Sequence, residues 1–172
     1  MEKVFIVGGG IMGTGIAQVF AQNGFSAVLR VRNLGGGRLE ELQAHFERTF
    51  SKLVKKGKIT EEDMTAALGR ISFTEDLADA ADSDLVIEAI VEDLEEKKAL
   101  FAELDGLCGP HTIFATNTSS LSITALASAT KREDRFIGMH FFNPVPIMAL
   151  IEVVKGARTS EETTEKVFEI AR

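Results

Sequence analysis

Residues 4–20 read VFIVGGGIMGTGIAQVF, and they decide the fold because an apolar, strand-like run passes directly into glycines and then into a helical pattern. Gly8, Gly10 and Gly13 have the spacing G-x-G-x-x-G. In this motif the first glycine permits a tight turn, the second lets a pyrophosphate approach the backbone, and the third lets the helix pack closely on the strand. The free N–H groups at the helix start attract the phosphates. The stretch therefore predicts a dinucleotide-binding site, the alternative being a glycine-rich turn without a ligand.

The contacts of this loop with a cofactor are expected at the three motif glycines and at the first residues of the helix, Ile11 and Met12. Around the loop, short apolar runs alternate with helical patterns, which predicts a mainly parallel sheet with helices on both faces. Strands are expected over residues 4–7, 27–31, 71–74, 84–90, 112–116, 136–140 and 150–154. Helices are expected over residues 12–23, 38–56 and 93–107, and from about residues 60 and 160 onward.

The helices that begin near residues 38 and 60 form an inserted pair within this order. Thr60 and Asp63 resemble a capping box, with Asp in the place of the usual Glu. The chain is therefore expected to form one Rossmann-type α/β domain over residues 1–172, with a mainly parallel sheet, helices on both faces and an inserted helical pair.

Composition argues against several classes of function. The chain has 172 residues and a net charge of −7, whereas nucleic-acid binding usually needs a basic surface. No apolar run approaches the roughly 18 residues that span a membrane, and no signal-peptide pattern is seen. The single cysteine, Cys108, rules out an internal disulfide and fits a cytoplasmic protein. His45 and His111 are interpreted as surface residues, and no metal site is expected.

Four further stretches carry a resemblance to a known family. They are NTSSLS at residues 117–122, GMHFFNP at 138–144, SKLVKKGKI at 51–59 and DLVIEAIVEDLEEKK at 84–98. Together with the glycine loop, they resemble the 3-hydroxyacyl-CoA dehydrogenase family over almost the whole chain, and most nearly its bacterial 3-hydroxybutyryl-CoA members. The resemblance implies an N-terminal domain that binds NAD. It also implies a helical C-terminal domain that forms homo-oligomers and completes the active site, so we expect this chain to be a truncated N-terminal domain.

The same resemblance assigns a catalytic role to three residues. His140 matches the base that takes the proton from the 3-hydroxyl group, and Glu152 matches its carboxylate partner. A carboxylate on one imidazole nitrogen fixes the tautomer and stabilises the imidazolium that forms. Ser119 matches a serine that hydrogen-bonds the substrate oxygen. The structural alternatives are a satisfied histidine at a strand end, a solvated glutamate and a serine at a helix N-cap.

Further contacts follow from the resemblance in the same way. Positions around the nicotinamide end of the cofactor are matched by Ala89, Ile90, Glu92, Lys97, Asn117 and Asn143. The resemblance also places CoA contacts on one helix, where Lys52 and Lys56 are spaced i,i+4 and so share a face. Lysines attract phosphate groups without demanding a fixed geometry. The alternatives are a helix cap, an ordinary exposed charge pair, and lysines that only complement the helix dipole.

The end of the second expected strand lacks an acid. Most of the family carries Asp where Val31 stands, and that Asp would bond the adenine ribose and repel a 2′-phosphate. Here Arg30, Arg32 and Asn33 surround the position, and a glycine-rich loop leads on to Arg38. Guanidinium groups suit phosphate. The sequence therefore favours NADP over NAD, the alternative being NAD whose ribose is bonded by Asn33.

These features predict an oxidoreductase that transfers a hydride between NADP or NAD and C3 of a short-chain (S)-3-hydroxyacyl-CoA or 3-oxoacyl-CoA. If NADPH is the partner, reduction is the expected direction. One alternative is a dinucleotide-binding domain without turnover of its own. Another is a dehydrogenase of small hydroxy acids, which the basic helix face at Lys52 and Lys56 disfavours.

Overall fold

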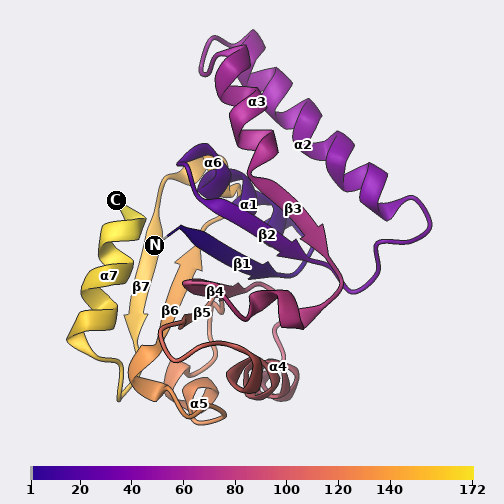
Figure 1. The fold of residues 1–172 in the computed structure, drawn as a ribbon. Helices are drawn as coiled ribbons and strands as arrows, with labels where there is room; N and C mark the ends of the chain where they lie inside the picture. Colours follow the sequence, from indigo (N-terminus) through magenta and orange to yellow (C-terminus); the bar gives the residue numbers. More distant parts are fainter. Residues whose placement is uncertain (1) are drawn as a thin grey trace.

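One seven-stranded sheet forms the centre of the computed structural model, which describes residues 2–172 (Figure 1). The strand order is β3-β2-β1-β4-β5-β6-β7. All neighbouring strands are parallel except β6 and β7. The strands are β1 (Lys3–Val7), β2 (Ser26–Arg30), β3 (Ile71–Thr74), β4 (Leu85–Glu88), β5 (Ile113–Thr116), β6 (Phe136–Phe141) and β7 (Ile151–Lys155). The predicted Rossmann-type, mainly parallel sheet is confirmed.

Helices cover both faces of the sheet, as the alternating sequence pattern predicts (Figure 1). The first face is covered by α1 (Ile11–Gln22), α2 (Arg38–Lys55), α3 (Glu61–Gly69), α6 (Val145–Met148) and α7 (Glu161–Ala171). The second is covered by the 3-10 helix η1 (Leu77–Ala80), α4 (Leu94–Leu107) and α5 (Ile123–Ala127). A short 3-10 helix, η2 (Glu133–Arg135), precedes β6. None of the helices in residues 2–172 is both long enough and apolar enough to cross a membrane.

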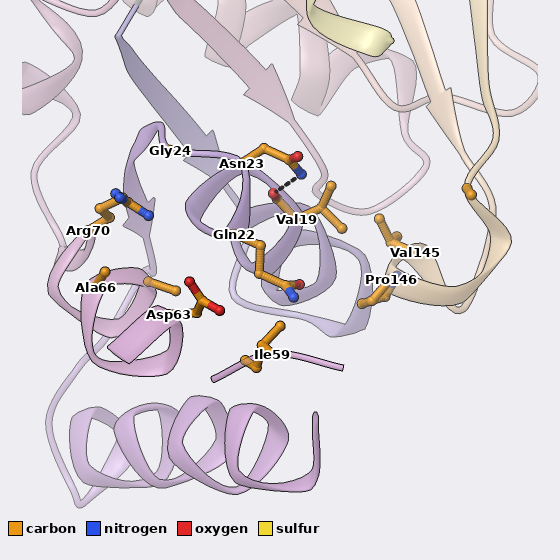
Figure 2. Close-up of a pocket in the computed structure, with 12 residues that line it drawn as sticks. Val19, Gln22, Asn23, Gly24, Ile59, Asp63, Ala66, Arg70, Val145 and Pro146 are labelled. Carbon is orange, nitrogen blue, oxygen red and sulfur yellow. Dashed lines mark hydrogen bonds between the residues drawn. The ribbon is translucent and has the colours of Figure 1, made fainter. Parts of the chain in front are cut away.

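The inserted pair, α2 and α3, packs at the β3 edge of the sheet, where Phe46 contacts Phe73, and extends beyond that edge (Figure 1). Thr60 Oγ1 accepts the Asp63 N–H at 3.0 Å, and the Asp63 carboxylate accepts the Thr60 N–H at 2.9 Å, so the predicted capping box is confirmed. A groove of about 720 Å³ lies between α3, the C-terminal end of α1, and α6, from which Val145 and Pro146 face it (Figure 2). None of the residues predicted as site residues lines this groove.

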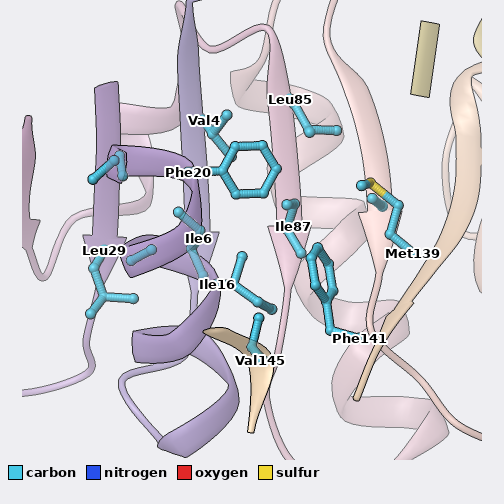
Figure 3. Close-up of a cluster of buried hydrophobic side chains, with 14 of the residues drawn as sticks. Val4, Ile6, Ile16, Phe20, Leu29, Leu85, Ile87, Met139, Phe141 and Val145 are labelled. Carbon is cyan, nitrogen blue, oxygen red and sulfur yellow. The ribbon is translucent and has the colours of Figure 1, made fainter. Parts of the chain in front are cut away.

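The core on the first face is packed mainly by aliphatic side chains of the strands and α1, with Phe141 of β6 among them (Figure 3). Ile16 and Phe20 of α1 pack against Val4 and Ile6 of β1 (Figure 3). Their spacing by four residues puts them on one face of the helix. The alternation of Val4 and Ile6 with Phe5 sends side chains to opposite faces of the sheet, so both faces of β1 are buried. Burial on both faces is expected for a parallel sheet.

The core on the second face depends on phenylalanines. The rings of Phe101 and Phe136 meet edge to face, with centroids 4.6 Å apart. Arg132 closes this core, because its guanidinium lies 4.5 Å from the centroid of the Phe114 ring. The same guanidinium pairs with the Asp105 carboxylate and donates to backbone carbonyls at the end of α4 and beyond it, those of Asp105, Cys108, Gly109 and Thr112. The last carbonyls of a helix lack intrahelical donors, so these bonds satisfy groups at the end of α4 such as the carbonyls of Asp105 and Cys108.

The structure differs from the sequence pattern at some element ends. β4 ends at Glu88, two residues earlier than predicted. The reason is that the Glu88 carboxylate accepts the Ile90 N–H at 2.7 Å, which turns the chain away from the ladder. Val31 lies just beyond β2 and not within it. The four-residue helix α6 was not predicted, since a single turn shows no hydrophobic period.

Candidate active site and cofactor crevice

The carboxyl ends of four strands meet at one edge of the sheet. Gly8 follows β1, Ala89 follows β4, Asn117 follows β5, and His140 is the penultimate residue of β6. In doubly wound folds, ligands bind in the crevice outside this edge, where the direction of strand order reverses. The order β3-β2-β1-β4 reverses between β1 and β4, so the glycine loop and the turn after β4 flank the crevice.

The glycine loop has the shape that the motif predicts. Gly8 adopts φ +128°, and a Cβ there would lie 2.3 Å from the carbonyl oxygen of Ala89. A Cβ at Gly13 would lie 1.7 Å from the carbonyl oxygen of Gly8, so both positions need glycine for close packing. A Cβ at Gly10 would meet no heavy atom within 4 Å. The space in front of Gly10, at the N-terminus of α1, thus fits the pyrophosphate of a dinucleotide.

A pocket of about 450 Å³ opens between the glycine loop, the end of β2 and the turn after β4. Among the described residues, its lining contains three arginines and no acidic residue: Gly8, Gly9, Gly10, Arg30, Val31, Arg32, Arg38, Ala89, Ile90 and Val91. Three guanidinium groups around one pocket make it strongly attractive to anions.

Each of these arginines is tied to the protein by part of its guanidinium. Arg30 Nε donates to the Glu75 carbonyl at 3.1 Å, and Arg32 Nη2 pairs with Glu96 of α4 at 3.1 Å. Arg38 Nη2 donates to the carbonyl oxygen of Gly9 at 2.7 Å. Asn33, the other polar residue predicted here, accepts the N–H of Gly35 and so braces its own loop. Sequence reasoning placed Arg38 only beside the site, because its contact with Gly9 depends on the loop conformation.

Ser119, His140 and Glu152 are brought together as the sequence predicts. Ser119 Oγ lies 3.2 Å from His140 Nε2, and Glu152 Oε2 lies 2.8 Å from His140 Nδ1. His140 and Glu152 are directly opposite each other in the antiparallel pair of β6 and β7. This arrangement leaves one ring nitrogen facing the serine while the carboxylate fixes the other, as a general acid–base pair requires.

A buried network of charged side chains lies near Ser119, His140 and Glu152 and consists of Lys97, Glu88 and Glu92. Lys97 is 1% exposed, and its Nζ lies 2.8 Å from Glu88 Oε1 and 2.9 Å from Glu92 Oε2. Glu88 is fully buried and also accepts the Thr116 hydroxyl at 2.7 Å. Lys97 is one of the residues that the family resemblance matches to the nicotinamide end of the cofactor. In the structure its ammonium is held by the two carboxylates, so Glu92 stands between Lys97 and the crevice.

Glu92 links this network to the loop that carries Thr118 and Ser119. Its Oε1 accepts the Thr118 hydroxyl and the Ser119 N–H, the latter at 3.0 Å. Burial alone would raise the pKa of Glu92, but the Thr118 hydroxyl, the Lys97 ammonium and the Ser119 amide together lower it to about 2. Glu92 therefore stays ionised and anchors the backbone of Ser119 beside His140.

The remaining predicted residues have different surroundings. Asn117 Oδ1 accepts the Phe141 N–H at 2.9 Å, which joins the ends of β5 and β6. Asn143 is exposed in the loop after β6. Lys52 and Lys56 are exposed at the C-terminal end of α2, the end away from the glycine loop. His45 and His111 are exposed, as interpreted from the sequence.

Known proteins match this chain over almost its whole length. The family model of the 3-hydroxyacyl-CoA dehydrogenase NAD binding domain matches residues 3–172. The chain belongs to this family. The resemblance carried by the glycine loop, NTSSLS and GMHFFNP is thereby confirmed, and a nicotinamide dinucleotide is the class of cofactor.

Individual relatives cover the chain almost completely. A 3-hydroxybutyryl-CoA dehydrogenase of Clostridioides difficile is 47% identical over 170 residues, which are 99% of this chain and 60% of that protein. The mitochondrial hydroxyacyl-coenzyme A dehydrogenase of Sus scrofa is 44% identical over 180 residues, covering 100% of this chain and 56% of the relative. The crystal structure of (S)-3-hydroxybutyryl-CoA dehydrogenase from Ralstonia eutropha matches with a TM-score of 0.94 at 42% identity, covering 99% and 60%. This member of the family therefore spans about three-fifths of these relatives.

Proposed function

We propose that this chain is the cofactor-binding domain of an oxidoreductase that interconverts short-chain (S)-3-hydroxyacyl-CoA and 3-oxoacyl-CoA. The contact series from Ser119 through His140 to Glu152 carries the proposal, because it places an oriented acid–base group at the crevice edge. The relatives in Clostridioides difficile and Ralstonia eutropha are named for a reaction of this type.

In this proposal, each of the three residues has one task. His140 Nε2 accepts the proton of the 3-hydroxyl group in oxidation and returns it in reduction. Glu152, 2.8 Å from Nδ1, holds the ring and stabilises the imidazolium. Ser119, 3.2 Å from Nε2, hydrogen-bonds the same substrate oxygen. The bound nicotinamide would supply or accept the hydride at C3.

The cofactor is proposed to lie along the crevice with its pyrophosphate at the glycine loop. Gly10 and the exposed Ile11 provide the open approach that the phosphates need. Polar contacts at the nicotinamide end would come from Glu92, Asn117 and Asn143. At the adenosine end, the pocket lined by Arg30, Arg32 and Arg38 supports NADP over NAD, because all the charged side chains that line it are positive.

The acyl-CoA substrate is proposed to bring its phosphates to Lys52 and Lys56, which are exposed on one side of α2. The segment that the relatives have beyond the matched region would complete the site and the homo-oligomer. A second candidate, a cofactor-binding domain that does not turn over alone, is favoured by exposed apolar side chains in the segment between His140 and Glu152. There Ile147 and Leu150 are 75% and 51% exposed. Free, buried Cys108 fits the cytoplasm as the location.

An assay of NADPH and NADH oxidation with acetoacetyl-CoA tests the reaction. Two samples are compared: this chain, and this chain fused to the part of the Clostridioides difficile relative that it does not cover. We expect the fusion to oxidise the cofactor only when acetoacetyl-CoA is present, while free acetoacetate gives little rate. Absence of turnover in both samples, with folding shown by circular dichroism, would contradict the enzyme proposal.

Titration of this chain with the two reduced cofactors tests the preference. We expect NADPH to bind at least about tenfold more tightly than NADH, since the extra phosphate gains charged hydrogen bonds. Quenching or enhancement of nicotinamide fluorescence measures both dissociation constants. The difference should shrink as salt rises from 20 mM to 500 mM, because exposed charges are screened. Tighter binding of NADH at low salt would overturn the preference and leave the proposed reaction intact.

A further inference from the structure

Gly9 is the point where the glycine loop meets both Val31 and Arg38. A Cβ added to Gly9 would lie 2.8 Å from Val31 Cγ2, so the Val31 side chain packs directly on this glycine. The carbonyl oxygen of the same glycine accepts Arg38 Nη2 at 2.7 Å. The Arg38 guanidinium is thus held beside Val31 within one pocket, although seven positions separate the two residues in the sequence.

Arg38 is also the more firmly held of the two arginines that follow β2. Its Nη1 pairs with Glu41 at 2.7 Å, one turn along α2, and its side chain is 35% exposed. Arg32 is 75% exposed, and its single pairing with Glu96 directs it towards α4. Holding a side chain in place before binding reduces the entropy that binding must overcome. On this ground Arg38 is the better recognition group.

Arg38 keeps donors available for a ligand. A guanidinium has five N–H groups, and within the described residues Arg38 uses one for Gly9 and one for Glu41. The remaining N–H groups can form a bidentate contact with phosphate oxygens. The carboxylate of Glu41 does not line the pocket, so it orients the guanidinium without placing negative charge against the ligand.

We propose that Arg38 is the specificity-determining residue that binds the 2′-phosphate of NADP, with Glu41 as its positioning residue. This inference rests on the proposed preference for NADPH and names the residue that produces it. Arg32 then contributes only general positive charge to the pocket. Its loss should weaken the binding of NADPH and NADH by more similar factors than the loss of Arg38 does.

The experiment measures dissociation constants of NADPH and NADH for the unaltered chain and for Arg38→Ala, Arg32→Ala and Glu41→Gln. Arg38→Ala should weaken NADPH about ten- to hundredfold and NADH by less than about threefold. Glu41→Gln should weaken NADPH by a few fold only. Arg48→Ala is the matched control, because it removes the same charge from the same helix at an exposed position that does not line the pocket. It should leave the ratio of the two constants unchanged. Thermal melting verifies that each variant is folded.

The outcomes separate the inference from the proposal beneath it. If the unaltered chain binds NADH more tightly, both the NADPH preference and the role of Arg38 are wrong. If the chain prefers NADPH and Arg38→Ala weakens both cofactors equally, Arg38 binds the shared pyrophosphate and the inference alone is wrong. A change of ratio in Arg32→Ala but not in Arg38→Ala would also overturn it. Arg38→Lys, which keeps the charge but loses the planar donors, should restore only part of the NADPH affinity.

Discussion

Replacing Lys97 with methionine should lower the free energy of unfolding by about 3–5 kcal/mol. Lys97 is the ammonium between two carboxylates, and Glu88 is 0% exposed. Methionine fills a similar volume but leaves the Glu88 charge buried without a counter-ion. A buried, unpaired charge costs far more than the pair contributes, which is why the effect of removing one partner is large.

Urea unfolding followed by circular dichroism measures this change. Lys98→Met is the matched control on the same helix, since Lys98 lies 3.9 Å from the exposed Glu95 and should cost under about 1 kcal/mol. Adding Glu88→Gln to Lys97→Met should recover part of the loss, because it removes the unpaired charge. A loss below about 1 kcal/mol in Lys97→Met would show that the network tolerates the missing charge.

The same variant has a local consequence at Glu92. Without the Lys97 ammonium, the pKa of Glu92 should rise from about 2 toward the ordinary 4.5. A depressed carboxyl pKa stabilises the fold above the ordinary value, and that stabilisation is lost as the pH falls toward about 2. Lys97→Met should therefore lose the anchoring of Ser119 at a higher pH than the unaltered chain. Nuclear magnetic resonance of the Ser119 amide during a pH titration detects this shift.

Replacing His140 with glutamine should lower kcat for acetoacetyl-CoA by about 10²–10⁴-fold, the usual contribution of a positioned acid–base group. Glutamine can still donate a hydrogen bond but cannot carry the proton that His140 would exchange with substrate. Because the proposed phosphate and adenosine contacts lie at the glycine loop and the arginine pocket, the dissociation constant for NADPH should change little.

The control for this variant is His45→Gln, since His45 is exposed on α2 and lies outside the catalytic series. It should keep full activity. Glu152→Gln should fall between the two, because an amide can still orient the ring but does not stabilise the imidazolium. The rates are measured in whichever sample turns over, the chain or its fusion. Near-normal kcat in His140→Gln would remove His140 from the proposed mechanism.

Most of the fold follows from the sequence for simple physical reasons. The run at residues 4–7 is buried on both faces, and the glycine spacing leaves few alternatives to a strand, a turn and a helix. α2 was predicted within one residue because it has 18 residues and a regular amphipathic pattern. By contrast, α6 has four residues and gives no such pattern.

The residues of the candidate site also differ in how well the sequence predicts them. Ser119, His140 and Glu152 could be predicted because the short motifs that carry the family resemblance contain them or lie close to them. The partners of Lys97 could not, because its spacing from Glu88 and Glu92 shows a possible charge pair but not whether it is buried. The contact between Arg38 and Gly9 depends on how the glycine-rich loop after β2 folds back, and residues 35–37 permit many conformations.

The register of the antiparallel strands β6 and β7 decides whether the Glu152 carboxylate meets the His140 imidazole. Ile151 and Val153 of β7 pack against the core, and Glu152 between them faces the side of His140. A slip by one residue would turn all three side chains over, exposing two apolar groups and removing the carboxylate from the imidazole. The apolar alternation of β7 thus selects the register in which the imidazole–carboxylate pair exists. A misregistered chain would lose stability and the pair at once, and the intervening segment is itself tied to the core through the buried Val145 of α6.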